Sequence, residues 1–173
     1  MSGERKEQRA SRHIEVTAAG ASEERGLHSA LAADSALTAH VFTWPVRVYW
    51  EDTDAGGVVY HASYLRFFER ARTEWLRAHG IDQSAVREKY GVVFVVRDIK
   101  IEFQAPARLD DELDVLIDAV ELRSASMSFA QRILRRCDGA VLTSARVRAA
   151  CVSAADFRPQ RIPEALFTEN KNK

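Results

Sequence analysis

Residues 49–80 place the strongest limit on what this chain can fold into, because they contain one long amphipathic helix. An acidic, glycine-containing turn comes first, and a helix of roughly 17 residues is predicted to follow it. Apolar side chains recur at intervals of three and four, which brings them to one helical face: Tyr64, Phe67, Phe68, Ala71, Trp75 and Ala78. Gly80 is placed to end the helix, where a left-handed backbone conformation is least costly. A single helix with one apolar face has to pack against another part of the chain.

The rest of the folded part carries strand-like patterns joined by short turns. We expect a strand over residues 46–50, introduced by Trp44-Pro45, and after the helix four more strands over residues 92–103, 112–122, 126–137 and 140–153. The pattern of the first of these four changes near Arg97-Asp98, which predicts a bulge. Consecutive strands joined by short turns form antiparallel sheets. The sequence therefore predicts an α+β fold, with an antiparallel sheet of about five strands wrapped around one long central helix.

Composition bounds the domain organisation and excludes several classes of protein. Residues 1–42 are rich in Ala, Ser, Glu and Arg, and we expect a disordered N-terminal extension followed by one domain over residues 43–169. The 25 basic and 25 acidic residues give no net charge, which argues against nucleic acid as a partner. No apolar run approaches the roughly 18 residues of a membrane span. No signal or transit peptide is predicted.

The two cysteines indicate the compartment. Asp138-Gly139 is typical of a two-residue hairpin turn, which sets the register of the strands on either side of it. In that register Cys137 and Cys151 would lie roughly 35 Å apart at the usual rise of a strand, too far for a disulfide. We therefore expect free thiols and a cytoplasmic location.

The acidic turn ahead of the helix is the candidate site. Asp52 and Asp54 have the first spacing of a calcium loop, but Gly56 and Ser63 stand where that loop needs two further oxygen ligands. Zinc-hydrolase, serine-hydrolase, phosphate-loop and dinucleotide motifs are absent from the sequence. Taken alone, Asp54 is more often a turn cap, and His61 more often a residue that caps or precedes a helix. Their combination with Gly56 and Gly57, which let a ligand approach the backbone, favours a functional site.

A longer pattern spans this turn and the helix start, Arg47-Val48-x-x-x-x-Thr53-Asp54-x-x-Gly57-Val58-Val59-Tyr60-His61-x-x-Tyr64. It resembles the signature of the 4-hydroxybenzoyl-CoA thioesterase family, which has the hotdog fold. Within that family, EDTDAGGVVYHASYLRFFERARTEWLR is very similar to the bacterial Tol–Pal-associated acyl-CoA thioesterases. The phrases FVVRDIKIEF, APARLDDEL and FAQRI extend the similarity across about residues 43–160. The resemblance implies homodimers formed by sheet continuation, often paired into homotetramers, and a functional link to the Tol–Pal envelope system.

The resemblance also implies a chemistry for the turn. Asp54 matches the family's catalytic carboxylate, which either attacks the thioester of an acyl-CoA substrate or activates water as a general base. Amides at the helix start near His61 would polarise the carbonyl oxygen. His61 would orient Asp54 or water, or hold the acyl group. Substrate-binding positions are expected at Gly57, Val58, Val59 and Tyr60. No cofactor or metal is required.

Two other functions stay open at this level. Hotdog proteins also serve as enoyl-CoA hydratases or dehydratases, but those use an Asp-x-Asn-Pro-x-His motif, whereas Asp54 and His61 here are separated differently and have Gly57 between them. A non-catalytic acyl-CoA-binding protein is the other alternative. Release of free thiol from acyl-CoA would separate a thioesterase from both.

Overall fold

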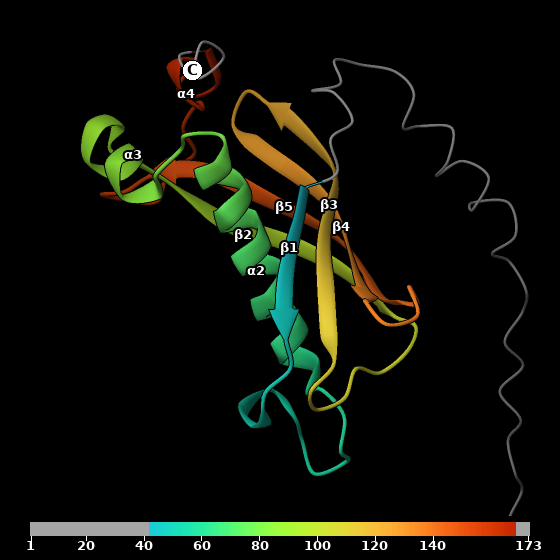
Figure 1. Cartoon of the computed structure of the whole chain (residues 1–173). Helices are drawn as coiled ribbons and strands as arrows, with labels where there is room; N and C mark the ends of the chain where they lie inside the picture. Colours follow the sequence, from blue (N-terminus) through green and yellow to red (C-terminus); the bar gives the residue numbers. More distant parts are fainter. Residues whose placement is uncertain (1–41, 169–173) are drawn as a thin grey trace, which may run out of the picture. The chain divides into compact units, whose positions relative to one another are not determined.

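The computed structural model describes residues 42–168 of the 173-residue chain, and Figure 1 shows their arrangement. Its strands are β1 (Phe42–Arg47), β2 (Val92–Phe103), β3 (Glu112–Arg123), β4 (Ser126–Arg135) and β5 (Val141–Ser153). Its helices are the 3₁₀ turn η1 (Trp50–Asp52) and the α-helices α2 (His61–Ala78), α3 (Gln83–Tyr90) and α4 (Ala165–Thr168). The predicted extension over residues 1–42 lies outside the described residues, except for Phe42, which begins β1.

The five strands form one antiparallel sheet in the order β1-β3-β4-β5-β2, and α2 lies across one face of it (Figure 1). The predicted α+β hotdog architecture is therefore confirmed. The bulge is also where the pattern predicts it, since the pairing of β2 with β5 shifts between Val96 and Asp98. Gly80 has the expected positive φ of 72° just beyond α2.

The first strand was predicted wrongly. It begins at Phe42 and ends at Arg47, whereas the predicted strand covered residues 46–50, and Trp50 belongs to η1. Pro45 lies inside β1, opposite Asp114 of β3. This is tolerated because β1 is an edge strand, where the missing N–H of a proline leaves no ladder bond unmade.

The inner face of the sheet and the apolar face of α2 form a core in two clusters. Phe67 and Phe68 belong to the cluster under the first half of α2, together with β3, β4 and β5. Trp75 and Phe129 belong to the second cluster, which α3 and α4 close, and their rings meet edge-on at 5.7 Å. The first cluster is the one that borders the acidic turn, because it contains Val48 and Val59.

A buried polar contact crosses from α2 to the sheet. The Arg72 guanidinium donates from Nη1 to Gln131 Oε1 at 2.9 Å, and Gln131 Nε2 donates to the Phe68 carbonyl at 3.2 Å. Arg72 and Gln131 are both buried, and burial lowers the pKa of the Arg72 guanidinium. The contact fixes how α2 is rotated about its own axis relative to β4.

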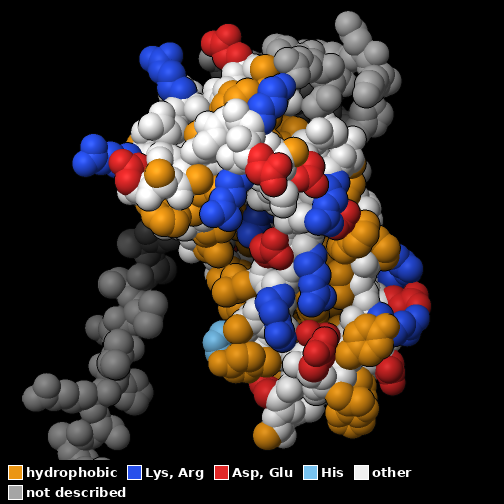
Figure 2. Space-filling view, turned by 90° about the vertical axis from the view of Figure 1, so that its left-hand side faces the viewer, with side chains coloured by type: hydrophobic (Ala, Val, Ile, Leu, Met, Phe, Trp, Pro, Cys, Tyr) orange, Lys and Arg blue, Asp and Glu red, His pale blue; other side chains and the backbone are white. Residues whose placement is uncertain are grey.

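The outward face of α2 is polar. Thr73 Oγ1 donates to Glu69 at 2.8 Å, and Arg77 pairs with Glu74. Figure 2 shows basic and acidic side chains interleaved over this side of the molecule, so no large patch of one charge forms there. Of the described helices, none combines the length and apolar character that crossing a bilayer requires. Cys137 is exposed, Cys151 is buried, and neither forms a disulfide, as predicted.

Candidate active site

The turn between β1 and α2 is organised by Asp52, which is buried although it is charged. Its carboxylate accepts the Tyr49 N–H at 3.1 Å and lies 3.5 Å from Arg66 Nη2. Its carbonyl accepts the Tyr60 N–H at 2.8 Å and the Ser63 hydroxyl at 3.2 Å. These bonds tie the start of the turn to the start of α2, so the intervening residues are presented on a fixed frame.

Asp54 stands at the exposed tip of this turn. Its Oδ1 accepts the Gly56 N–H at 2.8 Å, and its carbonyl accepts the Gly57 N–H at 3.0 Å, which is the turn-capping geometry considered for it. A side chain at Gly56 would begin 3.0 Å from Oδ1, and Gly57 has φ of +73°. Among the residues that the structure describes, none donates to Asp54 Oδ2. One carboxylate oxygen is therefore held by the turn, and the other accepts no hydrogen bond from residues 42–168.

His61 is the first residue of α2, after the extended residue Tyr60. Both side chains are exposed, their rings lie 4.2 Å apart, and the Tyr60 side chain makes no capping hydrogen bond at the helix start. Within residues 42–168, the amides of His61 and Ala62 donate no hydrogen bond. The positive end of an 18-residue helix is thus open at His61.

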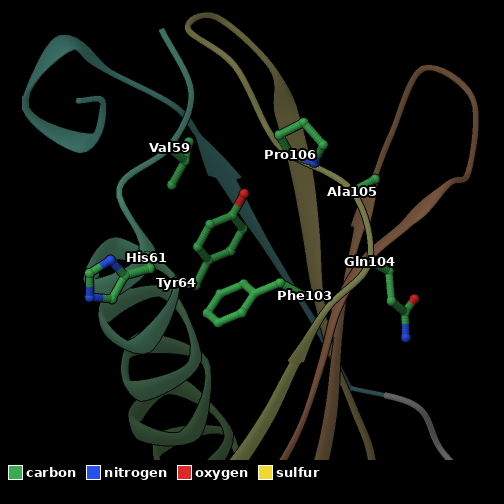
Figure 3. Close-up of a pocket in the computed structure, with 7 residues that line it drawn as sticks. All are labelled: Val59, His61, Tyr64, Phe103, Gln104, Ala105 and Pro106. Atoms are coloured by element: carbon green, nitrogen blue, oxygen red, sulfur yellow. The ribbon is translucent and has the colours of Figure 1, made fainter. Parts of the chain in front are cut away.

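A cavity of about 300 Å³ lies between the start of α2 and the end of β2. Figure 3 shows the Tyr64 ring between Val59 and Phe103, while the His61 ring is directed outward from the helix. The cavity is lined by Val59, His61, Tyr64, Phe103, Gln104, Ala105 and Pro106. Its walls are mostly apolar, which suits an acyl group.

The structure brings together only part of the predicted site. Of the six residues singled out from the sequence, Val59 and His61 line the cavity. The other four, Asp54, Gly57, Val58 and Tyr60, are not among its lining residues in this chain. No hydrogen bond joins Asp54 to His61 in the described part of the chain. Asp54 lies on the turn, and His61 is the first residue of the helix that follows it.

Sequence reasoning missed the opposite wall, which is formed by residues 103–106, and it assigned Tyr64 to the core alone. Tyr64 is only 3% exposed, and burial raises the pKa of its phenol above the ordinary value. Its place in the signature pattern was the one available signal that it belongs to the site. For residues 103–106 there was none, because their approach to α2 depends on the folded sheet.

Comparison with known proteins gives one consistent answer. A family model described as the thioesterase-like superfamily matches residues 48–168. The acyl-CoA thioester hydrolase YbgC of Escherichia coli O6:H1 is 47% identical over 131 residues, which cover 76% of this chain and 96% of that protein. The acyl-CoA thioesterase YbgC of Haemophilus influenzae is 46% identical over 125 residues, covering 72% of this chain and 90% of the other.

A solved structure agrees with these relatives. The probable thioesterase from Bartonella henselae superposes with a TM-score of 0.65 at 35% identity, over 72% of this chain and 100% of that one. The region matched by the family model, residues 48–168, lies entirely within the described residues, which form the sheet and its helices.

Proposed function

This chain belongs to the thioesterase-like superfamily, and we propose that it is an enzyme that hydrolyses acyl-CoA thioesters. Water adds to the thioester carbonyl carbon, the carbon–sulfur bond breaks, and a free acid and coenzyme A result. The observation that carries this proposal is the 47% identity to an acyl-CoA thioester hydrolase over nearly that protein's whole length. The mostly apolar cavity beside the open end of α2 supports it.

Asp54 is the proposed catalytic carboxylate. It acts either as the nucleophile, giving a mixed anhydride that water then hydrolyses, or as the general base that deprotonates the attacking water. Its support is the turn itself, in which Asp52 fixes the frame and the Gly56 N–H holds Oδ1, while Oδ2 accepts no hydrogen bond from the described residues. Both versions need the negative charge, so both predict the same result when that charge is removed.

The start of α2 is the proposed oxyanion site. The amides of His61 and Ala62 are the donors that the local hydrogen bonding leaves open, and the helix dipole favours negative charge there. A thiolate is a good leaving group, so the site needs no strong general acid. His61 is proposed to orient the attacking group or to hold the acyl chain at the mouth of the cavity.

Acyl-group contacts are proposed from the same turn. Val59 is buried and lines the cavity, so it supplies an apolar wall. Gly57 has no side chain to cover its backbone, and Val58 and Tyr60 are the sequence neighbours of Val59. We propose that these three residues contact the part of the substrate that extends beyond the cavity of one subunit.

Homodimers, and homotetramers formed from them, are proposed for the working state. In the described part of the chain β2 pairs only with β5, which leaves a twelve-residue edge with Val96, Ile99 and Phe103 exposed by 38% to 52%. The other edge, β1, is six residues long and carries Pro45. A long edge without proline is the better template for a second strand. Pairing two β2 edges would place a second subunit beside Phe103 and the cavity.

An oligomeric mass tests this pairing. We expect light scattering of the full chain to give at least twice 19.4 kDa. The double variant Val96→Asp/Ile99→Asp should shift the mass toward that of one chain, because two charges on each paired edge would have to be buried. Thr43→Asp, on the exposed side of β1, is the matched control and should leave the mass unchanged. An active wild-type sample with only the monomer mass would contradict the pairing.

A panel of CoA esters tests the function itself. A thioesterase releases free thiol, which a chromogenic disulfide reagent detects, whereas a hydratase consumes the ultraviolet absorbance of an enoyl-CoA without releasing thiol. A non-catalytic binding protein does neither. Thiol release from at least one acyl-CoA is the expected result, and its absence over a full chain-length series would overturn the proposal. The cytoplasmic location stays a proposal that rests on the two free cysteines. The Tol–Pal link stays a proposal that rests on the sequence resemblance.

A further inference from the structure

At one end, the far wall of the cavity is hydrogen-bonded to the start of α2 and to the residues before it through Ala107, which is completely buried. Its carbonyl accepts the Val59 N–H at 2.9 Å, and its N–H donates to the Tyr64 hydroxyl at 2.9 Å. The other end of this wall is held by the sheet, because the amides of Gln104 and Ala105 donate to the Leu142 carbonyl at 2.9 and 3.1 Å. Residues 104–107, which we call the roof segment, are therefore fixed at both ends.

Tyr64 is both a wall of the cavity and the anchor of its roof. Figure 3 shows its hydroxyl pointing toward the gap between Val59 and Pro106. The ring meets Phe103 edge-on at 5.5 Å and Phe67 at 6.2 Å, so its orientation is set by packing on two sides. Tyr64 is therefore the side-chain tie that sets the distance between α2 and the roof segment, beside the backbone bond from the Val59 N–H to Ala107.

We propose that Tyr64 is a positioning residue that determines acyl-group selectivity by fixing the roof segment over the cavity. This inference rests on the proposed thioesterase function and adds a residue that sets which acyl group fits. Tyr64 is proposed to determine how well an acyl chain fits the cavity, through its contacts with Ala107 and Phe103. It is proposed to take no part in the reaction at Asp54.

The hydroxyl can be removed without removing the ring. Tyr64→Phe keeps the contacts with Phe103 and Phe67 but deletes the acceptor of the Ala107 N–H, which is then left unpaired in a buried place. The roof segment must shift or admit water to satisfy that amide. A cavity whose wall is no longer fixed discriminates less between acyl groups that differ by a few methylenes, since each such difference is worth about tenfold or more in a well-fitted pocket.

The experiment compares kcat/KM of the full chain over straight-chain acyl-CoAs from acetyl to lauroyl. The ratio of interest is kcat/KM for the preferred acyl-CoA divided by kcat/KM for the next longer, poorly used one. In Tyr64→Phe we expect this ratio to fall about tenfold, mainly through a change in KM. Tyr90→Phe is the matched control, because Tyr90 lies on α3 in the other core cluster. It should keep the wild-type profile. Melting temperature is measured for each variant in parallel.

An unchanged dependence of kcat/KM on acyl-chain length in Tyr64→Phe would overturn the inference, whether or not the melting temperature falls. If the melting temperature alone falls, the hydrogen bond to Ala107 is merely structural. If Tyr64→Phe does not fold, Phe103→Leu decides, because it enlarges the same cavity and keeps the hydrogen bond. We expect Phe103→Leu to keep the native mass of the wild type and to prefer longer acyl groups. An unchanged preferred acyl-chain length overturns the inference. A wild-type chain that releases no thiol would instead refute the proposed function.

Discussion

Asp54→Asn is expected to lower kcat about a hundredfold or more and to leave the fold intact. Asparagine is nearly the same size and its side-chain oxygen still accepts the Gly56 N–H that Asp54 Oδ1 accepts at 2.8 Å. It is neither a nucleophile nor a base at neutral pH, so both versions of the mechanism lose their reacting group. Steady-state thiol release measures kcat, and circular dichroism with a melting curve checks the fold.

Asp156→Asn is the matched control for this substitution. Asp156 is an exposed carboxylate whose Oδ1 accepts an amide two residues further on, from Arg158 at 3.2 Å, which repeats the geometry of Asp54 and Gly56. It lies after β5, apart from the proposed site, and its loss should leave kcat at the wild-type value. More than a tenth of wild-type kcat in Asp54→Asn would remove Asp54 from the catalytic role.

His61→Ala is expected to lower kcat about a hundredfold at little cost in stability. Its side chain is exposed, makes no hydrogen bond to the described residues, and makes a ring contact with Tyr60. A purely structural role for it would therefore be small. Orientation of the attacking group accounts for a loss of this size, since positioning and acid–base effects are each worth two or more orders of magnitude.

The other end of α2 supplies the control, because His79 directly follows the last residue of the helix and its imidazole, unlike that of His61, has a bonding partner. Its Nδ1 lies 2.7 Å from the Trp75 carbonyl and its ring lies 4.2 Å from the Trp75 ring. His79→Ala should lower the melting temperature and keep kcat. If His61→Ala instead resembles His79→Ala in both measurements, catalysis is left to Asp54 and the backbone donors.

Local periodicity was sufficient to predict most of the fold. The amphipathic pattern predicted α2 because three-and-four spacing is a property of one segment, independent of the rest of the chain. The bounds of β2 and its bulge followed in the same way from a change of alternation at Arg97. The first strand was mislocated because Pro45 counts against a strand in general, and only its place at a sheet edge makes it acceptable.

The site was less predictable, since its parts meet only in the folded chain. Asp52 and Asp54 look equivalent in the sequence, yet the first is buried and organises the turn while the second is exposed. Phe103 looks like the last residue of a strand pattern. Its position opposite Tyr64 arises because β2 ends beside the start of α2, and no local pattern reports that juxtaposition.

The buried bond between Arg72 and Gln131 has a consequence for how sequences of this kind can diverge. A guanidinium in the core needs the amide oxygen that faces it, so Gln131→Leu alone would leave a buried cation without its acceptor, which is strongly destabilising. Replacing both residues by apolar side chains of similar volume removes that conflict and should be tolerated far better. Whether a substitution at one of these two positions is tolerated therefore depends on the residue at the other. In sequences that diverge from this one, positions 72 and 131 should change together. A substitution at only one of them should be followed by a substitution at the other or be eliminated.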